Sequence, residues 1–170
     1  MKIDYIIPTL YRPTLSRTIA SIQKENVNHN LLIFGNKDSA GYNRNEGLKK
    51  VIDSDWIVFV DDDDYLITGH SKELDKDFDL VVLRMKQDEN IIPNRGNNIL
   101  QAGNMGINFA IKTSFYNEHK FLFDNKGHEE DWRFFLQLTE KTEKIKVTDK
   151  IYYIAPQINH FYVLSNNTEK

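Results

Sequence analysis

The stretch WIVFVDDDDYL, residues 56–66, places five apolar side chains directly before four consecutive aspartates. The apolar part has the length and composition of a strand that is buried on both faces. The aspartates repel one another, and no lysine or arginine follows within the next four residues. Such a cluster at a strand end is costly unless a cation neutralises it. The stretch predicts either a solvated loop or a site for a divalent cation such as Mg²⁺ or Mn²⁺, and we favour the cation.

Strand and helix patterns alternate upstream of this stretch. Residues 3–8 and 31–35 form short apolar runs typical of buried strands, and residues 14–26 and 44–52 have the spacing of helices. This order predicts a parallel, right-handed α/β unit that binds its ligand at the carboxyl ends of the strands. The polar segments that follow the three strands (Pro-Thr, Gly-Asn-Lys-Asp and the four aspartates) are therefore expected to gather at one edge of the sheet.

The second half of the chain is less regular. Its patterns predict strands at residues 78–86 and 104–112, a helix at 128–143 and one or two closing strands at 145–155. Within that helix, Trp132, Phe135, Leu136 and Leu138 are the side chains expected to face the core.

The amino-acid composition limits the classes of protein to which this chain can belong. The 170 residues indicate a single domain, and the net charge of -3 gives no reason to expect a nucleic-acid partner. The chain has no cysteine, which excludes disulfides and thiolate chemistry and fits a cytoplasmic location. No apolar run is long enough for a transmembrane segment. Peripheral contact with a membrane and a homodimer both stay open.

Four motifs carry a resemblance to a known family. They are IIPTLYRP (6–13), SAGYNRNEGL (39–48), VFVDDDDYL (58–66) and GHEEDWRFFLQL (127–138). Their order and spacing resemble the family 2 glycosyltransferases. The resemblance implies the GT-A fold, a three-layer α/β/α sandwich around a mostly parallel central sheet. It also implies a nucleotide-binding half at about residues 1–66 and an acceptor and catalytic half at about 67–170.

The resemblance assigns the aspartates to a metal and a nucleotide sugar. In that family, the carboxylates of an Asp-x-Asp motif hold Mn²⁺ or Mg²⁺ and contact the donor. Here Asp61 and Asp63 would be metal ligands, with Asp62 near the ribose or the donor sugar, and Asp64 matches a further acidic position. His160 is a candidate additional ligand, although a lone histidine is more often an ordinary surface or core residue.

Other positions match contacts to the donor. Thr9 and Tyr11 correspond to residues that contact the base, although Tyr11 could equally be a surface aromatic. Arg44 corresponds to an arginine that reaches the base or a phosphate. Gly103, Asn104 and Met105 match a stretch that lines the donor-sugar pocket. The chain departs from the pattern at GNKDSAG, where the family has Asp-Asp-x-Ser, so Asp38 is a weaker match and the identity of the base stays open.

A second acidic cluster comprises Glu129, Glu130 and Asp131. Acidic residues in a helix's first turn stabilise the helix dipole without any further function. The resemblance instead makes Glu130-Asp131 the catalytic pair, with Asp131 as the general base that deprotonates an attacking sugar hydroxyl. His128, beside the pair, is a weaker candidate for contact with substrate.

Together these assignments predict an inverting glycosyltransferase that moves a sugar from a nucleotide diphosphate donor, expected to be a UDP-sugar, to a hydroxyl on a glycan, lipid-linked or protein acceptor. Two alternatives stay open. A nucleotidyltransferase also uses carboxylates and metal, but PTLYRPTLSR (8–17) lacks the expected phosphate-binding glycines. A non-catalytic module that binds sugar nucleotides or carbohydrates would keep the same donor residues.

Overall fold

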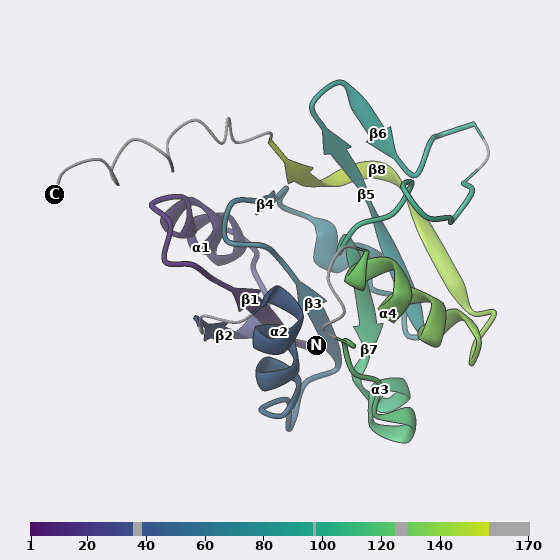
Figure 1. Cartoon of the computed structure of the whole chain (residues 1–170), viewed down its shortest axis with the longest axis horizontal. Coiled ribbons are helices and arrows are strands. Elements are labelled where there is room, and N and C mark those ends of the chain that lie inside the picture. Colours follow the sequence, from purple (N-terminus) through teal and green to yellow (C-terminus); the bar gives the residue numbers. More distant parts are fainter. Residues whose placement is uncertain (36–38, 97, 125–128, 157–170) are drawn as a thin grey trace, which may run out of the picture.

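A computed structural model describes residues 1–35, 39–96, 98–124 and 129–156 (Figure 1). The elements in chain order are β1 (Lys2–Pro8), α1 (Leu15–Gln23), β2 (Asn28–Phe34), α2 (Ala40–Leu48), β3 (Trp56–Phe59), β4 (Tyr65–Leu66), the 3₁₀ helix η1 (His70–Glu73), β5 (Leu80–Gln87), β6 (Asn90–Ile92), β7 (Phe109–Lys112), α3 (Thr113–His119), α4 (Glu130–Thr139) and β8 (Ile145–Ala155).

One sheet runs through both halves of the chain. Its strand order is β2-β1-β3-β7-β5-β8-β4, with β6 paired to β5. β1 is parallel to β2 and β3, β5 is parallel to β8, and β7 runs antiparallel between β3 and β5. Within the described residues, β1, β2, β3, β5 and β8 therefore point the same way. The mixed α/β fold with a mostly parallel sheet that the sequence predicts is confirmed.

Neighbouring residues of β1 show that helices cover both faces of the sheet. Tyr5 and Ile6 point to opposite faces because side chains alternate along a strand. The Tyr5 hydroxyl lies 2.7 Å from a ring nitrogen of His70 in η1, and Glu25, just after α1, lies 3.5 Å from the same ring. On the other face, a Cβ atom on Gly47 of α2 would lie only 2.5 Å from Ile6. The close approach of α2 to the sheet therefore depends on glycine at this position.

Aromatic side chains fill the space beneath α4. Phe59 lies beside Ile6 in the parallel register and thus on the same face as α2. Its ring contacts that of Phe134 in α4, which stacks on Phe123 with ring centroids 3.9 Å apart. The prediction that Leu136 faces the core is wrong, since it is 39% exposed. Leu136 lies two residues, or about 200° of helix rotation, from the fully buried Phe134.

Several element boundaries differ from the sequence predictions. α2 begins at Ala40 rather than Arg44, because the hydroxyl of Ser39 accepts a hydrogen bond from the backbone N–H of Tyr42 and caps the helix. The predicted strand at residues 104–112 is confined to β7, and α3 begins at the next residue. The closing segment is a single strand, β8, as one of the two predicted alternatives has it.

The register of the parallel strands places the polar segments at one edge. Pro8 at the end of β1 lies beside Phe34 at the end of β2, and Ile6 lies beside Phe59 near the end of β3. Thr9 and the aspartates therefore emerge together, as predicted for these two segments. The Gly-Asn-Lys-Asp segment falls largely on residues 36–38, outside the described residues. No helix in the described part of the chain is long and apolar enough to span a membrane.

Candidate active site

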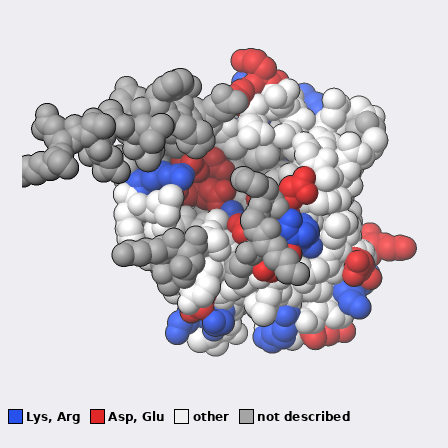
Figure 2. Space-filling view, viewed as in Figure 1, with Lys and Arg blue, Asp and Glu red and all other residues white. Residues whose placement is uncertain are grey.

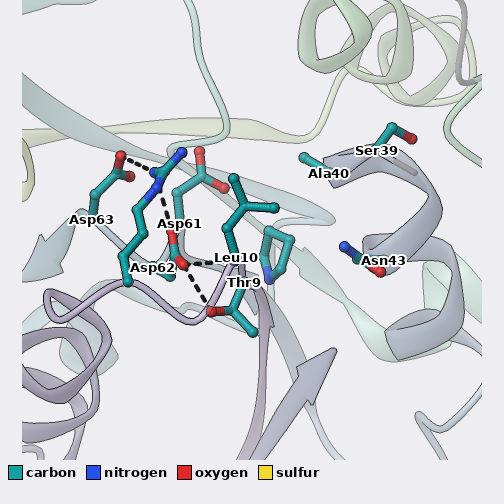
Figure 3. Close-up of a pocket in the computed structure, with 10 residues that line it drawn as sticks. Thr9, Leu10, Ser39, Ala40, Asn43, Asp61, Asp62 and Asp63 are labelled. Atoms are coloured by element: carbon teal, nitrogen blue, oxygen red, sulfur yellow. Dashed lines mark hydrogen bonds and ion pairs between the residues drawn. The ribbon is translucent and has the colours of Figure 1, made fainter. Parts of the chain in front are cut away.

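The aspartate run lies against the loop that follows β1. Asp62 is buried, and one oxygen of its carboxylate accepts hydrogen bonds from the Thr9 hydroxyl at 2.7 Å and the Leu10 backbone N–H at 2.9 Å (Figure 3). The hydroxyl of Thr18 in α1 donates to the backbone oxygens of Asp62 and Asp64. Asp62 therefore joins β1 to β3, and both its oxygens are engaged, since Arg12 donates to the second one at 3.2 Å.

The other three aspartates converge on one point. One carboxylate oxygen from each of Asp61, Asp63 and Asp64 lies within 4.8 Å of the others. Burial, together with the neighbouring Asp61, raises the pKa of Asp64 to about 8, and the same two causes raise the pKa of Asp63. Three carboxylates this close are all ionised together only if a cation joins them. An oxygen-only set of ligands fits Mg²⁺ or Mn²⁺.

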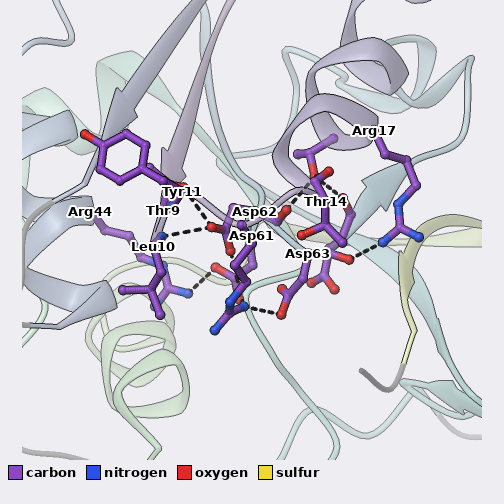
Figure 4. Close-up of polar contacts among 12 residues, drawn as sticks. Thr9, Leu10, Tyr11, Thr14, Arg17, Arg44, Asp61, Asp62 and Asp63 are labelled. Carbon is purple, nitrogen blue, oxygen red and sulfur yellow. Dashed lines mark hydrogen bonds and ion pairs between the residues drawn. The ribbon is translucent and has the colours of Figure 1, made fainter. Parts of the chain in front are cut away.

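Arg44 joins this cluster to the second acidic pair. Its Nη2 donates to Asp61 at 2.6 Å (Figure 4). Its Nη1 donates to Asp131 at 2.6 Å and to Glu130 at 2.8 Å. Arg44 is 2% exposed, so its guanidinium is shielded from solvent, whereas the side chains of its three acidic partners are 16–32% exposed. Burial alone would lower the pKa of Arg44, but Asp61 and Asp131 outweigh it and the pKa is raised. Arg44 therefore remains charged and holds the end of β3 and the start of α4 together.

Asp131 combines partial access with a shifted pKa. Its side chain is 28% exposed and lines a cavity of about 430 Å³ together with Asp61 and Glu129. Burial raises the pKa of Asp131 to about 6, because the opposing effect of Arg44 is smaller and Asp61 and Glu130 add to the rise. A carboxylate in this range is mostly ionised at neutral pH and is a stronger base than an ordinary aspartate. In the space-filling view, acidic side chains gather in a hollow with basic side chains beside them (Figure 2).

The sequence matches no protein-family model and no curated protein. Structural comparison, however, finds close likeness. TarS residues 1–349 of S. aureus in complex with UDP-GlcNAc gives a TM-score of 0.77 at 18% identity over 93% of this chain and 59% of that one. The mannosyltransferase PcManGT from Pyrobaculum calidifontis, in complex with GDP-Man and Mn²⁺, gives 0.66 at 10% identity over 94% and 58%. GalNAc-T7 with UDP, GalNAc and Mn²⁺ gives 0.63 at 12% identity over 92% and 43%.

The chain has the GT-A glycosyltransferase fold. It spans about 59% of the length of the TarS chain that it matches. At these identities the likeness establishes the fold alone. In this GT-A fold the two acidic clusters that the sequence singles out meet through a buried arginine, as the ion pairs of Arg44 show.

The residues predicted to contact the base lie next to the aspartates. Thr9 lines a cavity of about 370 Å³ with Asp61, Asp62 and Asp63. Tyr11 has a left-handed backbone, with φ of 57°, and is 71% exposed. A Cβ atom on Gly35, just after β2, would collide with the Tyr11 ring, so the ring lies directly against that glycine. The roles of Thr9 and Tyr11 in base recognition remain predictions.

Other predicted donor contacts lie apart or outside the described residues. Gly103 and Asn104 line a different cavity, of about 550 Å³, beside β6, and Met105 is 9% exposed and packs in the hydrophobic core. Their role at the donor sugar stays a prediction that this placement does not support. Three further candidates, Asp38, His128 and His160, lie outside the described residues.

The structure adds site residues that sequence reasoning missed. The guanidinium of Arg12 pairs with Asp62 and Asp63, and Tyr153 of β8 donates its hydroxyl proton to Asp64 at 2.7 Å. Asn45 exchanges two hydrogen bonds of 2.9 Å with the backbone of Phe123. Arg12 belongs to a motif that the sequence already marked, so its position was a usable signal. Tyr153 lies 89 residues from Asp64 in the sequence, so no local sequence pattern indicates that contact.

Proposed function

We propose that this chain is a metal-dependent, inverting glycosyltransferase that takes its sugar from a nucleoside diphosphate donor. The observation that carries the proposal is the ion-pair network in which Arg44 joins Asp61, at the end of β3, to Asp131, at the start of α4. It brings an oxygen-ligand cluster and a carboxylate of raised pKa to one edge of a GT-A sheet. The bound UDP-GlcNAc, GDP-Man and Mn²⁺ of the structural neighbours support this assignment.

The donor would lie in the cavity between the aspartates and the start of α2. This cavity is lined by Thr9, Ser39, Asn43 and the first three aspartates. Asp61 and Asp63, with Asp64 beside them, would hold Mn²⁺ or Mg²⁺. When bound, the metal would supply positive charge to the departing diphosphate. The base is expected to be uracil, by analogy with the UDP complexes of neighbours, and the acceptor class stays open among glycans, lipid-linked sugars and proteins.

Asp131 would act on the acceptor rather than on the donor. Its side chain opens onto the neighbouring cavity, which it shares with Asp61. An acceptor hydroxyl in that cavity would transfer its proton to Asp131 as its oxygen attacks the anomeric carbon from the face opposite the diphosphate. The bond from the anomeric carbon to the phosphate oxygen breaks in the same step, so the configuration inverts. Arg44, which also binds Glu130, would keep the carboxylate in place.

Two measurements on the whole chain test the proposal. UDP and UDP-sugars should raise the melting temperature in Mn²⁺ and much less in EDTA, and Asp63→Asn should abolish the metal-dependent part. Asp131→Asn should bind the donor nearly as well as the parent yet transfer sugar at least about a hundredfold more slowly. Glu140→Gln, which removes an exposed carboxylate from the far end of α4, is the matched control.

The outcomes separate the candidate functions. Donor binding without any transfer or donor hydrolysis would favour the non-catalytic binding module. No thermal shift with any nucleoside diphosphate in Mn²⁺ would overturn the proposal. Equal turnover in the parent and Asp131→Asn would reduce the Glu130-Asp131 pair to a helix cap.

A further inference from the structure

A basic side chain already occupies part of the proposed metal site. Arg12 lies in the loop between β1 and α1, and its Nη1 donates to Asp63 as well as to Asp62. The Asp63 carboxylate is one of the three that converge. In this structure Asp63, a ligand of the proposed metal, is therefore already paired with the guanidinium of Arg12.

The two aspartates depend on Arg12 to different degrees. Asp62 is 3% exposed and accepts two further hydrogen bonds, from Thr9 and Leu10, so it keeps partners without the arginine. The side chain of Asp63 is 24% exposed, and Arg12 is the cation that its carboxylate contacts. Loss of Arg12 would leave Asp63 beside Asp61 and Asp64 with no counter-ion among the described residues.

Arg12 can leave Asp63 without a change in the backbone. Its side chain is 37% exposed, and residues 9–12 lie outside the helices and strands. The backbone just before it is fixed, since Asp62 holds Leu10 and the Thr9 hydroxyl accepts from the Tyr11 N–H. Arg12 also lines the 370 Å³ cavity proposed for the donor, so a rotation of its side chain is enough to turn the guanidinium toward a phosphate there.

We infer that Arg12 and a divalent cation compete for Asp63, and that the displaced guanidinium pairs with the diphosphate of the donor in the adjoining cavity. The inference rests on the proposed function, because it presumes that metal and diphosphate bind at this edge. A metal ion that binds alone must displace Arg12 from the Asp63 carboxylate. When a diphosphate binds together with the metal, the displaced Arg12 gains the diphosphate as a new anionic partner. Mn²⁺ and nucleoside diphosphate therefore strengthen each other's binding, to the same extent in both directions.

Mn²⁺ binding to the whole chain tests this directly, by the electron paramagnetic resonance signal of free Mn²⁺ in the presence and absence of UDP. Without UDP, Arg12→Gln should bind Mn²⁺ about two- to fivefold more tightly than the parent, as expected for removal of a partly exposed competing ion pair. UDP should then increase the Mn²⁺ affinity of Arg12→Gln less than that of the parent, and UDP itself should bind the variant more weakly in saturating Mn²⁺.

Arg17→Gln is the matched control. The guanidinium of Arg17 donates to the backbone oxygen of Asp63 at 2.5 Å and lies over the Tyr65 ring, so its removal takes away one nearby positive charge without freeing the Asp63 carboxylate. We expect its Mn²⁺ affinity to stay within about twofold of the parent, since exposed charges are screened. Thermal melting of each protein establishes that it is folded.

The other outcomes overturn the inference or the function beneath it. Equal Mn²⁺ affinity in the parent and Arg12→Gln, with UDP binding still dependent on metal, would refute the competition and leave the proposed function intact. Equal tightening in Arg12→Gln and Arg17→Gln would replace the competition with a general charge effect. Absence of Mn²⁺ binding in every protein, with and without UDP, would refute the metal site itself.

Discussion

Arg44 is the residue on which the proposed site depends most, and its replacement by methionine gives the sharpest test of the ion-pair network. Methionine keeps an unbranched side chain of similar length but removes the charge. Three carboxylates, those of Asp61, Glu130 and Asp131, then lose a partner at 2.6 to 2.8 Å. Because Arg44 is 2% exposed, water cannot fully replace it.

The expected loss of stability follows from this burial. Removal of one member of a buried ion pair costs about 3–5 kcal/mol, and this is the upper range here, because the three carboxylates left behind are 16–32% exposed. For a chain of this length, about 1 kcal/mol corresponds to roughly 2–4 °C, so Arg44→Met should lower the melting temperature by at most roughly 6–20 °C. Most domains have about 5–15 kcal/mol of stability, so the variant should still fold. Urea unfolding followed by tryptophan fluorescence measures the loss.

A second arginine supplies the control. Arg133 in α4 makes two hydrogen bonds to Asp124, at 2.7 and 3.0 Å, but its side chain is 31% exposed. Arg133→Met should therefore cost no more than about 1 kcal/mol. Adding Glu130→Gln to Arg44→Met should restore part of the loss, by about 0.5–3 kcal/mol, since one unpaired carboxylate disappears. The reasoning fails if Arg44→Met is no less stable than Arg133→Met.

Two further predictions concern the scaffold. Gly47→Ala should destabilise the fold by about 1–3 kcal/mol, measured by urea unfolding, because the new Cβ would collide with the fully buried Ile6. This loss should outweigh alanine's better helix propensity. Gly96→Ala is the control and should change stability little, so equal stability of the two variants would contradict the prediction. His70 should contribute a loss of up to about 1.4 kcal/mol between pH 7.5 and 5.5, because burial lowers its pKa in the folded state, so protons bind the unfolded chain first as pH falls below 6.5. Asp64 and Asp131 oppose this loss, because their raised pKa values stabilise the fold as pH falls. The His70 contribution is therefore the difference in pH dependence between the parent and His70→Asn, and equal pH dependence of the two proteins would contradict it.

The sequence predicted the sheet edge better than the helix faces. The apolar runs before Pro8 and before Asp61 are strong signals, because strands buried on both faces need continuous apolar sequence. In the α4 segment nearly every second residue is apolar, so the spacing alone did not distinguish Phe134 from Leu136. The aromatic contacts of Phe134 with Phe59, Phe109 and Phe123 decide which of them is buried.

In the candidate site, too, the local motif indicated which residues are important but not which distant residues they contact. The motif around Arg44 was visible, and in the structure three of its residues have a clear physical role. Arg44 forms ion pairs with the acidic side chains, Asn45 hydrogen-bonds to the backbone of Phe123, and Gly47 lets α2 pack closely against Ile6. The target of Arg44 was not visible, because Asp131 lies 87 residues away. A charged side chain in a motif reveals that it has a partner but not which partner.

The charge balance explains why the aspartate run needs more than these arginines. Six carboxyl groups lie at this edge, Asp61 to Asp64 with Glu130 and Asp131, and the guanidinium groups that contact them or their backbone are those of Arg12, Arg17 and Arg44. With Asp64 protonated at neutral pH, as its pKa of about 8 implies, negative charge among these described groups still exceeds positive charge by two. A diphosphate brought to this edge would add to that excess and be repelled. One divalent cation removes it, so the geometry leads us to expect that nucleoside diphosphate binds this chain with a metal or only weakly.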